Sequence, residues 1–289
     1  MALVLALLES CANRGQGPQG GPRDSIPPVV VKEVPANATL NFAQNQLEVI
    51  FDEYIQLDDI QKNVLISPPQ QTPPEVKAVG KKLSVVFQED LIDSTTYTID
   101  FGAAICDYNE KIPLKGYVYS FSTGDVIDSL TISGRLYDAA TLDPMPEVLI
   151  GIHRNLSDTA LNTLPFTRIT RTNTEGFFTV HNVHDGVYRI YALNDISRDY
   201  LFQPGEGLAF SDSLIKPFCE LHQHTDTIWR DTLGIGALGD TLFTRLIDST
   251  CTHSISHFYP DSLIIWYFEE AKQRHYFQGV YREEQHAFS

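Results

Sequence analysis

Apolar residues recur at every second position in many short segments of this 289-residue chain, and turn residues separate the segments. Leu47, Val49 and Phe51 form one such series, and residues 96–102 repeat the pattern. Neighbouring side chains of a strand point to opposite faces, so each series predicts a strand with one buried face. These segments have no helical periodicity. The pattern predicts an all-β protein.

Changes in composition divide the chain into four parts. Glycine and proline are concentrated before residue 25, and "FSTGD" closes a first group of predicted strands near residue 125. We therefore predict a leader and flexible tether over residues 1–24, a first β-module over 25–125, a second over 126–215, and a linker with the start of a further, truncated β-module over 216–289.

The first module carries the segments "IPPVVVKEVPANA", "LEVIFDEYIQLDD", "TTYTIDFG" and "FSTGD". These segments resemble bacterial Ig-like domains of the SbsA type. The resemblance implies a β-sandwich that acts as a structural spacer or adhesive module, with no catalytic residues. Asp52 and Glu53 are adjacent, so a strand would direct them to opposite faces, and they cannot form an acid–base pair.

The second module carries Gly134-Arg135-Leu136, "TRTNTEGFFTVHNV" and "DGVYRIYALND". It resembles a transthyretin-like domain of the carboxypeptidase regulatory (CnaB) type. Such domains occur beside peptidases without holding the peptidase site, so the resemblance implies a second β-sandwich for binding or spacing. Turn residues at 174–176 and 185–186 predict hairpins between the strands on either side.

The first residues resemble a bacterial lipobox. An apolar segment, residues 2–8, precedes Ser10 and Cys11, and residues 13–24 are rich in glycine and proline. The resemblance implies that lipid on Cys11 anchors a Bacteroidetes-type lipoprotein, and the following segment would be a flexible tether. Glu9 and the absence of a basic residue before Arg14 depart from the lipobox pattern. The alternative is a buried N-terminal strand with an ordinary core cysteine.

Charge and cysteine content exclude several classes of protein. The formal net charge is -16, with 37 acidic and 21 basic residues, which opposes contact with nucleic acid. Cys11, Cys106, Cys219 and Cys251 form no CxxC pair, so no zinc ribbon or thioredoxin-like motif is present. The disulfide status of the last three cysteines stays open.

Two polar segments offer candidate metal ligands. Asp195, Ser197, Asp199 and Glu206 stand at positions 1, 3, 5 and 12 of a calcium-loop register, although Tyr200 occupies the position where an EF-hand needs glycine. The alternative is a polar loop whose aspartates cap turns. A zinc site would draw on the following residues: Cys219, His222, His224 and Asp226. Its alternative is a linker with incidental histidines.

The last part of the chain is rich in aromatic residues. Trp266, Tyr267 and Tyr276 lie in two predicted strands, residues 262–268 and 275–281. They would form either a sugar-stacking platform or part of a core or domain interface.

Together these features predict a non-enzymatic cell-envelope lipoprotein with no cofactor, anchored in a membrane that we expect to be the outer membrane. Its expected role is a structural, spacer or binding module, with an envelope protein or a glycan as partner. The alternatives are a calcium-dependent adhesin and a metal-dependent hydrolase that uses His222 and His224.

Overall fold

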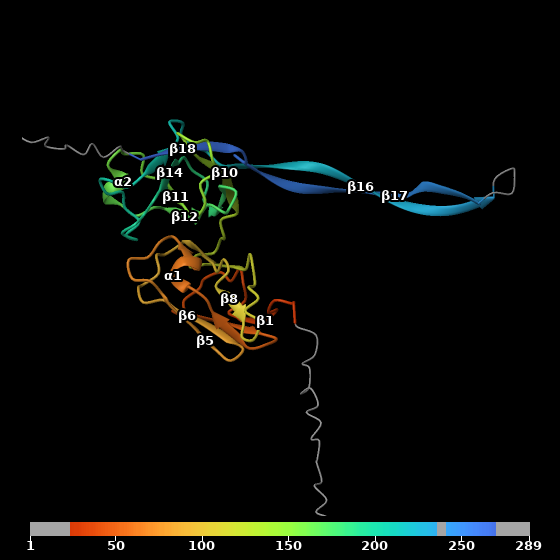
Figure 1. Cartoon of the computed structure of the whole chain (residues 1–289), viewed down its shortest axis with the longest axis horizontal. Helices are drawn as coiled ribbons and strands as arrows, with labels where there is room; N and C mark the ends of the chain where they lie inside the picture. The colour runs from red at the N-terminus through yellow and green to blue at the C-terminus, as the bar shows by residue number, and fades with distance from the viewer. Residues whose placement is uncertain (1–23, 236–240, 270–289) are drawn as a thin grey trace, which may run out of the picture.

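Strands make up nearly all the regular structure of the computed structural model, which describes residues 24–235 and 241–269 (Figure 1). Within these ranges the only helices are two single turns, α1 (Ile60–Asn63) and α2 (Ala160–Thr163). The all-β prediction is confirmed. No helix in the same ranges is long and apolar enough to cross a bilayer.

The first module packs antiparallel sheets against one another. A four-stranded sheet, in the order β1-β2-β6-β5, consists of β1 (Val30–Val34), β2 (Gln46–Phe51), β6 (Lys82–Val86) and β5 (Glu75–Val79). A three-stranded sheet, in the order β4-β7-β9, consists of β4 (Leu65–Ser67), β7 (Thr96–Asp100) and β9 (Val118–Ser122). A third pair joins β3 (Ile55–Leu57) to β8 (Ile105–Asp107).

The core of the first module forms where the predicted alternation places it. Leu47 and Val49 of β2 are fully buried, and they belong to one apolar cluster with Tyr97 and Phe121 of the facing sheet. The rings of Tyr97 and Phe121 are stacked with centroids 5.3 Å apart. Burial of these large side chains against one another holds the two sheets together.

The second module is built on one seven-stranded sheet, in the order β12-β11-β14-β15-β18-β10-β13. Its strands are β10 (Leu130–Asp138), β11 (Leu149–His153), β12 (Arg168–Arg171), β13 (Phe177–Val183), β14 (Arg189–Leu193), β15 (Leu208–Phe210) and β18 (Leu263–Phe268). The first and last strands of this order, β12 and β13, contact each other. The sheet therefore curls around its own apolar core, which includes Ile132, Ile150, Val180 and Ile190.

The predicted hairpins of the second module are wrong, although the turns themselves occur. Residues 174–176 connect β12 to β13, and residues 185–186 connect β13 to β14. However, β12 pairs with β11, β13 pairs with β10, and β14 lies between β11 and β15. Each turn connects a strand in one half of the curled sheet to a strand in the other half. The two strands on either side of a turn are therefore not hydrogen-bonded to each other.

The prediction that residues 262–268 begin a further module is also wrong. Strand β18 lies between β15 and β10, antiparallel to the first and parallel to the second. Ile265 and Tyr267 are 1% and 2% exposed and belong to the core of the second module. The strand fills the gap that β10 and β15 would otherwise leave, so the second module extends past residue 215.

The segment between β15 and β18 is a long hairpin of β16 (Phe218–Ile235) and β17 (Thr241–Tyr259), which projects away from the second module (Figure 1). A β-bulge interrupts its register between Ile228 and Trp229. No third strand joins this pair among the residues that the structure describes. The segment thus forms a two-stranded arm. We call residues 218–259 the arm.

The close approach of β10 and β18 provides a test of the sheet. A Cβ atom at Gly134 would lie 2.4 Å from the carbonyl oxygen of Leu263, so Gly134→Ala must push the strands apart. We expect this variant to lose about 1–3 kcal/mol in free energy of unfolding, measured by urea denaturation. Gly186→Ala is the control because its Cβ would be 3.4 Å from its nearest neighbour. An equal loss in both variants would contradict the observed strand order.

Candidate functional site

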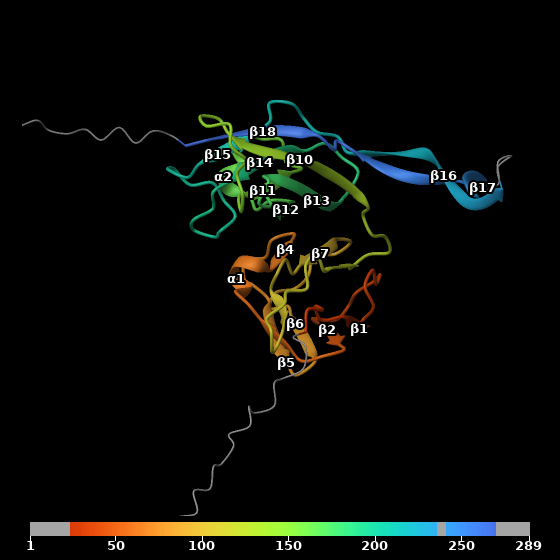
Figure 2. The same cartoon turned by 45° about the vertical axis from the view of Figure 1, so that its right-hand side comes forward.

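The two modules meet through the three-stranded sheet of the first and strands β12 and β13 of the second (Figure 2). Leu65 of β4 belongs to an apolar cluster whose other buried members, among them Leu149 and Ile169, come from the second module. Ser67 is 4% exposed, and its Oγ accepts a hydrogen bond of 3.0 Å from the backbone N–H of Ile169. The contact therefore combines shared apolar burial with buried hydrogen bonds.

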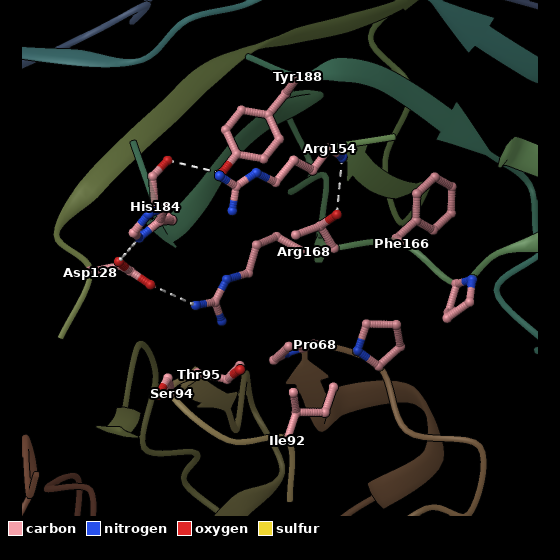
Figure 3. A pocket seen from close by; sticks show the side chains of 13 residues that line it. Pro68, Ile92, Ser94, Thr95, Asp128, Arg154, Phe166, Arg168, His184 and Tyr188 are labelled. Carbon is pink, nitrogen blue, oxygen red and sulfur yellow. Dashed lines mark hydrogen bonds and ion pairs between the residues drawn. The ribbon is translucent and has the colours of Figure 1, made fainter. Parts of the chain in front are cut away.

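Beside this contact lies a cleft of about 460 Å³, lined by residues of both modules and of the segment between them (Figure 3). The first module contributes Pro68, Pro69, Ile92, Ser94 and Thr95; the connecting segment contributes Asp128; the second contributes Arg154, Pro165, Phe166, Thr167, Arg168, His184 and Tyr188. Ligand sites favour concave interfaces of this kind. The cleft is the candidate functional site.

Arg168 opens strand β12 and is the central charged group of the cleft. It is 4% exposed, and its Nη1 donates a hydrogen bond of 3.0 Å to the backbone oxygen of Ser67. Its Nη2 lies 3.7 Å from Oδ2 of Asp128. Burial lowers the pKa of Arg168 to about 10, while the Asp128 carboxylate acts in the opposite direction. The guanidinium is therefore charged at neutral pH and links the two modules.

The Asp128 carboxylate contacts three groups: Arg168, His184 and Thr96. Its Oδ1 lies 2.8 Å from Nδ1 of His184, and its Oδ2 accepts a hydrogen bond from the hydroxyl of Thr96 at 3.1 Å. The hydroxyl of Tyr188 donates to the backbone oxygen of His184 at 2.9 Å. These contacts hold the carboxylate and the imidazole at the edge of the cleft.

Arg154 follows strand β11, and its side chain lies beside Tyr188 in the close view (Figure 3). Its backbone N–H donates to Oγ1 of Thr167 at 3.1 Å, but its exposed guanidinium makes no ion pair or hydrogen bond to the described residues. Sequence reasoning did not identify Arg154, Arg168 or Asp128. The only signal was an arginine next to an apolar residue in "RIT", which does not distinguish a buried arginine from a surface one.

The candidate calcium ligands lie together in one loop of the second module. Oδ1 and Oδ2 of Asp195 accept backbone hydrogen bonds from Arg198 and Tyr200, at 2.7 and 3.1 Å. Oδ1 also accepts from the hydroxyl of Ser197 at 3.1 Å. Asp199 accepts from the N–H of Leu201, and Glu206 accepts from those of Ile196 and Gln203. The carboxylates thus hold the turns of the loop.

The candidate zinc ligands lie on strand β16 of the arm. His222, His224 and Asp226 alternate onto one face of the strand, and Cys219 lies on the other. His253 and His257 of β17 complete a row of four imidazoles, with His224 and His253 ring centroids 5.6 Å apart. Sequence reasoning missed these two partners, which lie on a separate strand. The described residues contain no group of three or more histidine, cysteine, aspartate or glutamate side chains able to hold a metal ion.

The remaining sequence candidates fall in different places. Cys11 and Tyr276 lie outside the described residues. Trp266 and Tyr267 are neighbours on β18, so their rings lie on opposite faces; Trp266 is 46% exposed, whereas Tyr267 is buried in the core. They do not form a shared stacking platform. Cys106 is buried, Cys219 and Cys251 are exposed, and all three are free thiols.

A buried histidine behind the cleft predicts a pH dependence of stability. His153 is 2% exposed, packs against the ring of Phe166, and its Nε2 has no hydrogen-bond partner in the described structure. Burial lowers its pKa to about 4, so the unfolded chain takes up a proton at higher pH than the folded protein does. The stability that depends on a neutral His153 is present in full above pH ~6.5 and is lost as the pH falls towards 4.

We expect this histidine to account for up to about 3 kcal/mol of the stability lost between pH 7 and pH 4. Urea denaturation across this range measures the slope, and His153→Phe should flatten it whatever its effect at pH 7. His224→Phe, on the exposed arm, should leave most of the slope in place. An unchanged slope in His153→Phe would show that the imidazole is not buried in its neutral form.

Comparison with known proteins identifies one part of the chain. A search of curated proteins found no match to the chain. Among solved structures, the chain resembles an L,D-transpeptidase from Mycobacterium smegmatis at 15% identity and a TM-score of 0.25, over 44% of this chain and 54% of that one. It also resembles the N-terminal part of the S-layer protein SbsC, at 14% identity and a TM-score of 0.24, over 58% and 40%. The chain thus spans about half the length, or less, of these two proteins.

A third similar structure is BcpA, the major pilin subunit of Bacillus cereus, at 10% identity and a TM-score of 0.21, over 84% of this chain and 71% of that one. The family model of the bacterial Ig-like domain matches residues 24–123. These bounds agree closely with the first module, and the match confirms the Ig-like family expected for it. Residues 24–123 are therefore a bacterial Ig-like domain.

Proposed function

We propose that this chain is a non-enzymatic structural module of a bacterial cell envelope, held at the outer membrane by lipid on Cys11. The match of the first module to bacterial Ig-like domains supports the structural role. The buried contact between Arg168 and Ser67 also supports the structural role. It joins the two β-modules into one stiff unit, as a structural spacer requires. We also propose that the second module is transthyretin-like in type.

The arm supports a role in contacting another component of the envelope. Several of its apolar side chains are exposed, including Leu221, Trp229, Leu246 and Ile247. The outer edges of its two strands present backbone donors and acceptors that recognise an extended polypeptide. We propose an envelope protein as the partner, with a glycan as the alternative.

Metabolic labelling with a fatty acid tests the anchor. In the native host, the full-length protein should incorporate the label and sediment with the membrane fraction, and Cys11→Ser should abolish both. Cys219→Ser is the control because that thiol is also free and is exposed on the arm, outside the lipobox-like segment of the sequence. A Cys11→Ser protein that still takes up label and stays with the membrane would overturn the proposed anchor.

A further inference from the structure

The cleft carries a positive charge within a strongly acidic chain. The net charge of the whole sequence is -16, yet the side chains that line the cleft include two guanidinium groups and one carboxylate. The formal charges of these three groups sum to one positive charge. A local positive field inside a negative protein attracts anions to this site and not to the surrounding surface.

Arg168 has hydrogen-bonding capacity that the protein does not use. Its Nη1 is bonded to Ser67, and the 3.7 Å separation between Nη2 and Asp128 is too long for a hydrogen bond. Arg168 is one of the residues that line the cleft, and its guanidinium lies there beside Asp128 (Figure 3). Its one hydrogen bond among the described residues is the one to Ser67, so further N–H groups of the guanidinium are without a hydrogen-bond acceptor.

Arg154 supplies the second guanidinium from the neighbouring strand. It comes directly after β11, which pairs with β12 so that Ile152 lies opposite Arg168. The side chains of Arg154 and Arg168 both enter the cleft from the second module, while Pro68 and Ile92 face them from the first (Figure 3). A ligand between them would meet charged donors on one side and an apolar wall on the other.

We propose that this cleft binds a small ligand that carries one carboxylate, held between Arg154 and Arg168. The planar guanidinium fork matches a carboxylate with two parallel hydrogen bonds. A single negative charge balances the formal charge of the cleft, whereas a doubly charged phosphate would add repulsion from Asp128. The volume of about 460 Å³ lies in the range of small-molecule sites, and Ile92, which is 60% exposed, offers apolar contact to the body of the ligand.

Isothermal titration calorimetry of the full chain tests the site with defined probes. D-galacturonate and N-acetylglycine present the same carboxylate on a sugar and on a peptide, and the tighter of the two identifies the source of the ligand. We expect at least one to bind, and we expect D-galactose, which lacks the carboxylate, and inorganic phosphate to bind much more weakly. Failure of both carboxylates, or equal binding of galactose or phosphate, would overturn the proposal.

The variant Arg154→Gln tests the position of the ligand. Removing one charged hydrogen-bond donor from the cleft should weaken binding of the carboxylate about 10-fold or more. Arg154 is exposed, and its guanidinium makes no ion pair or hydrogen bond to the described residues, so we expect its loss to leave the fold intact. Arg135→Gln is the matched control, since Arg135 is exposed on β10 outside the cleft. Equal affinity in Arg154→Gln and the wild type would place the ligand elsewhere.

The result is independent of the proposed anchor. Binding is measured on the purified chain without its membrane, so a failed titration leaves the labelling result at Cys11 untouched. A failed labelling experiment likewise leaves the carboxylate site standing.

Discussion

Arg168→Met should lower the free energy of unfolding by about 3 kcal/mol and weaken the contact between the two modules. The substitution keeps an unbranched apolar stem but leaves Asp128 without its buried cation and the backbone oxygen of Ser67 without its donor. Removing a buried, charged donor is costly because the oxygen of the buried Ser67 stays desolvated without a partner and the partly buried Asp128 loses its countercharge. Urea denaturation followed by fluorescence and circular dichroism measures the loss.

The same substitution at an exposed position separates this effect from a general effect of methionine. Arg135 is exposed on β10, and its guanidinium lies over the Phe177 ring at 6.0 Å from the ring centroid, so Arg135→Met should change the free energy of unfolding by less than about 1 kcal/mol. If Arg168→Met were as mild as Arg135→Met, the buried arginine would not be what joins the modules.

Ile265→Asp should unfold the second module. Ile265 is 1% exposed in β18 and contributes to the core of the curled sheet, so the substitution places an unpaired carboxylate in an apolar interior. We expect a loss of more than about 4 kcal/mol, visible as disappearance of the native tertiary signal of this module. Near-ultraviolet circular dichroism and amide hydrogen exchange are the measurements.

The adjacent residue provides the control. Ile264 is 59% exposed on the opposite face of the same strand, so Ile264→Asp should leave the module folded. This contrast requires β18 to be a strand of the second module with the observed facing. A folded Ile265→Asp protein, or equal damage from both variants, would contradict that placement.

Strand positions in the first module were predictable because their burial follows local alternation. Leu47, Val49 and Phe51 are buried as their spacing predicts, since one face of β2 meets the core and the other does not. Thr96 and Thr98 of β7 are exceptions to this alternation of buried and exposed residues. Both lie on the opposite face from the core yet are buried, because the second module covers that face. A sequence pattern within one module does not report what covers it.

Pairing between strands was less predictable than their positions. Strand β18 is apolar at all six residues, so the sequence does not show which residues face the core. Its parallel partner β10 lies more than a hundred residues earlier, and the whole arm intervenes. Local turn signals favour pairing of neighbours, whereas here the apolar faces could be buried only by strands from distant parts of the chain.

The roles of the candidate site residues were hard to predict from the sequence for a related reason. The spacing of Asp195, Ser197 and Asp199 suits calcium ligands and turn caps equally, and only the positions of the backbone N–H groups show that these oxygens hold turns. Arg168 gave no signal because arginine is seldom buried, and its burial depends on Ser67 and Asp128 arriving from outside its module.

Differential scanning calorimetry tests most directly the claim that the two modules form one unit. We expect a single cooperative transition for the wild-type chain, which should separate into two transitions in Arg168→Met as the contact weakens. Two separate transitions in the wild type, unchanged in Arg168→Met, would show that the modules unfold independently and would contradict the account.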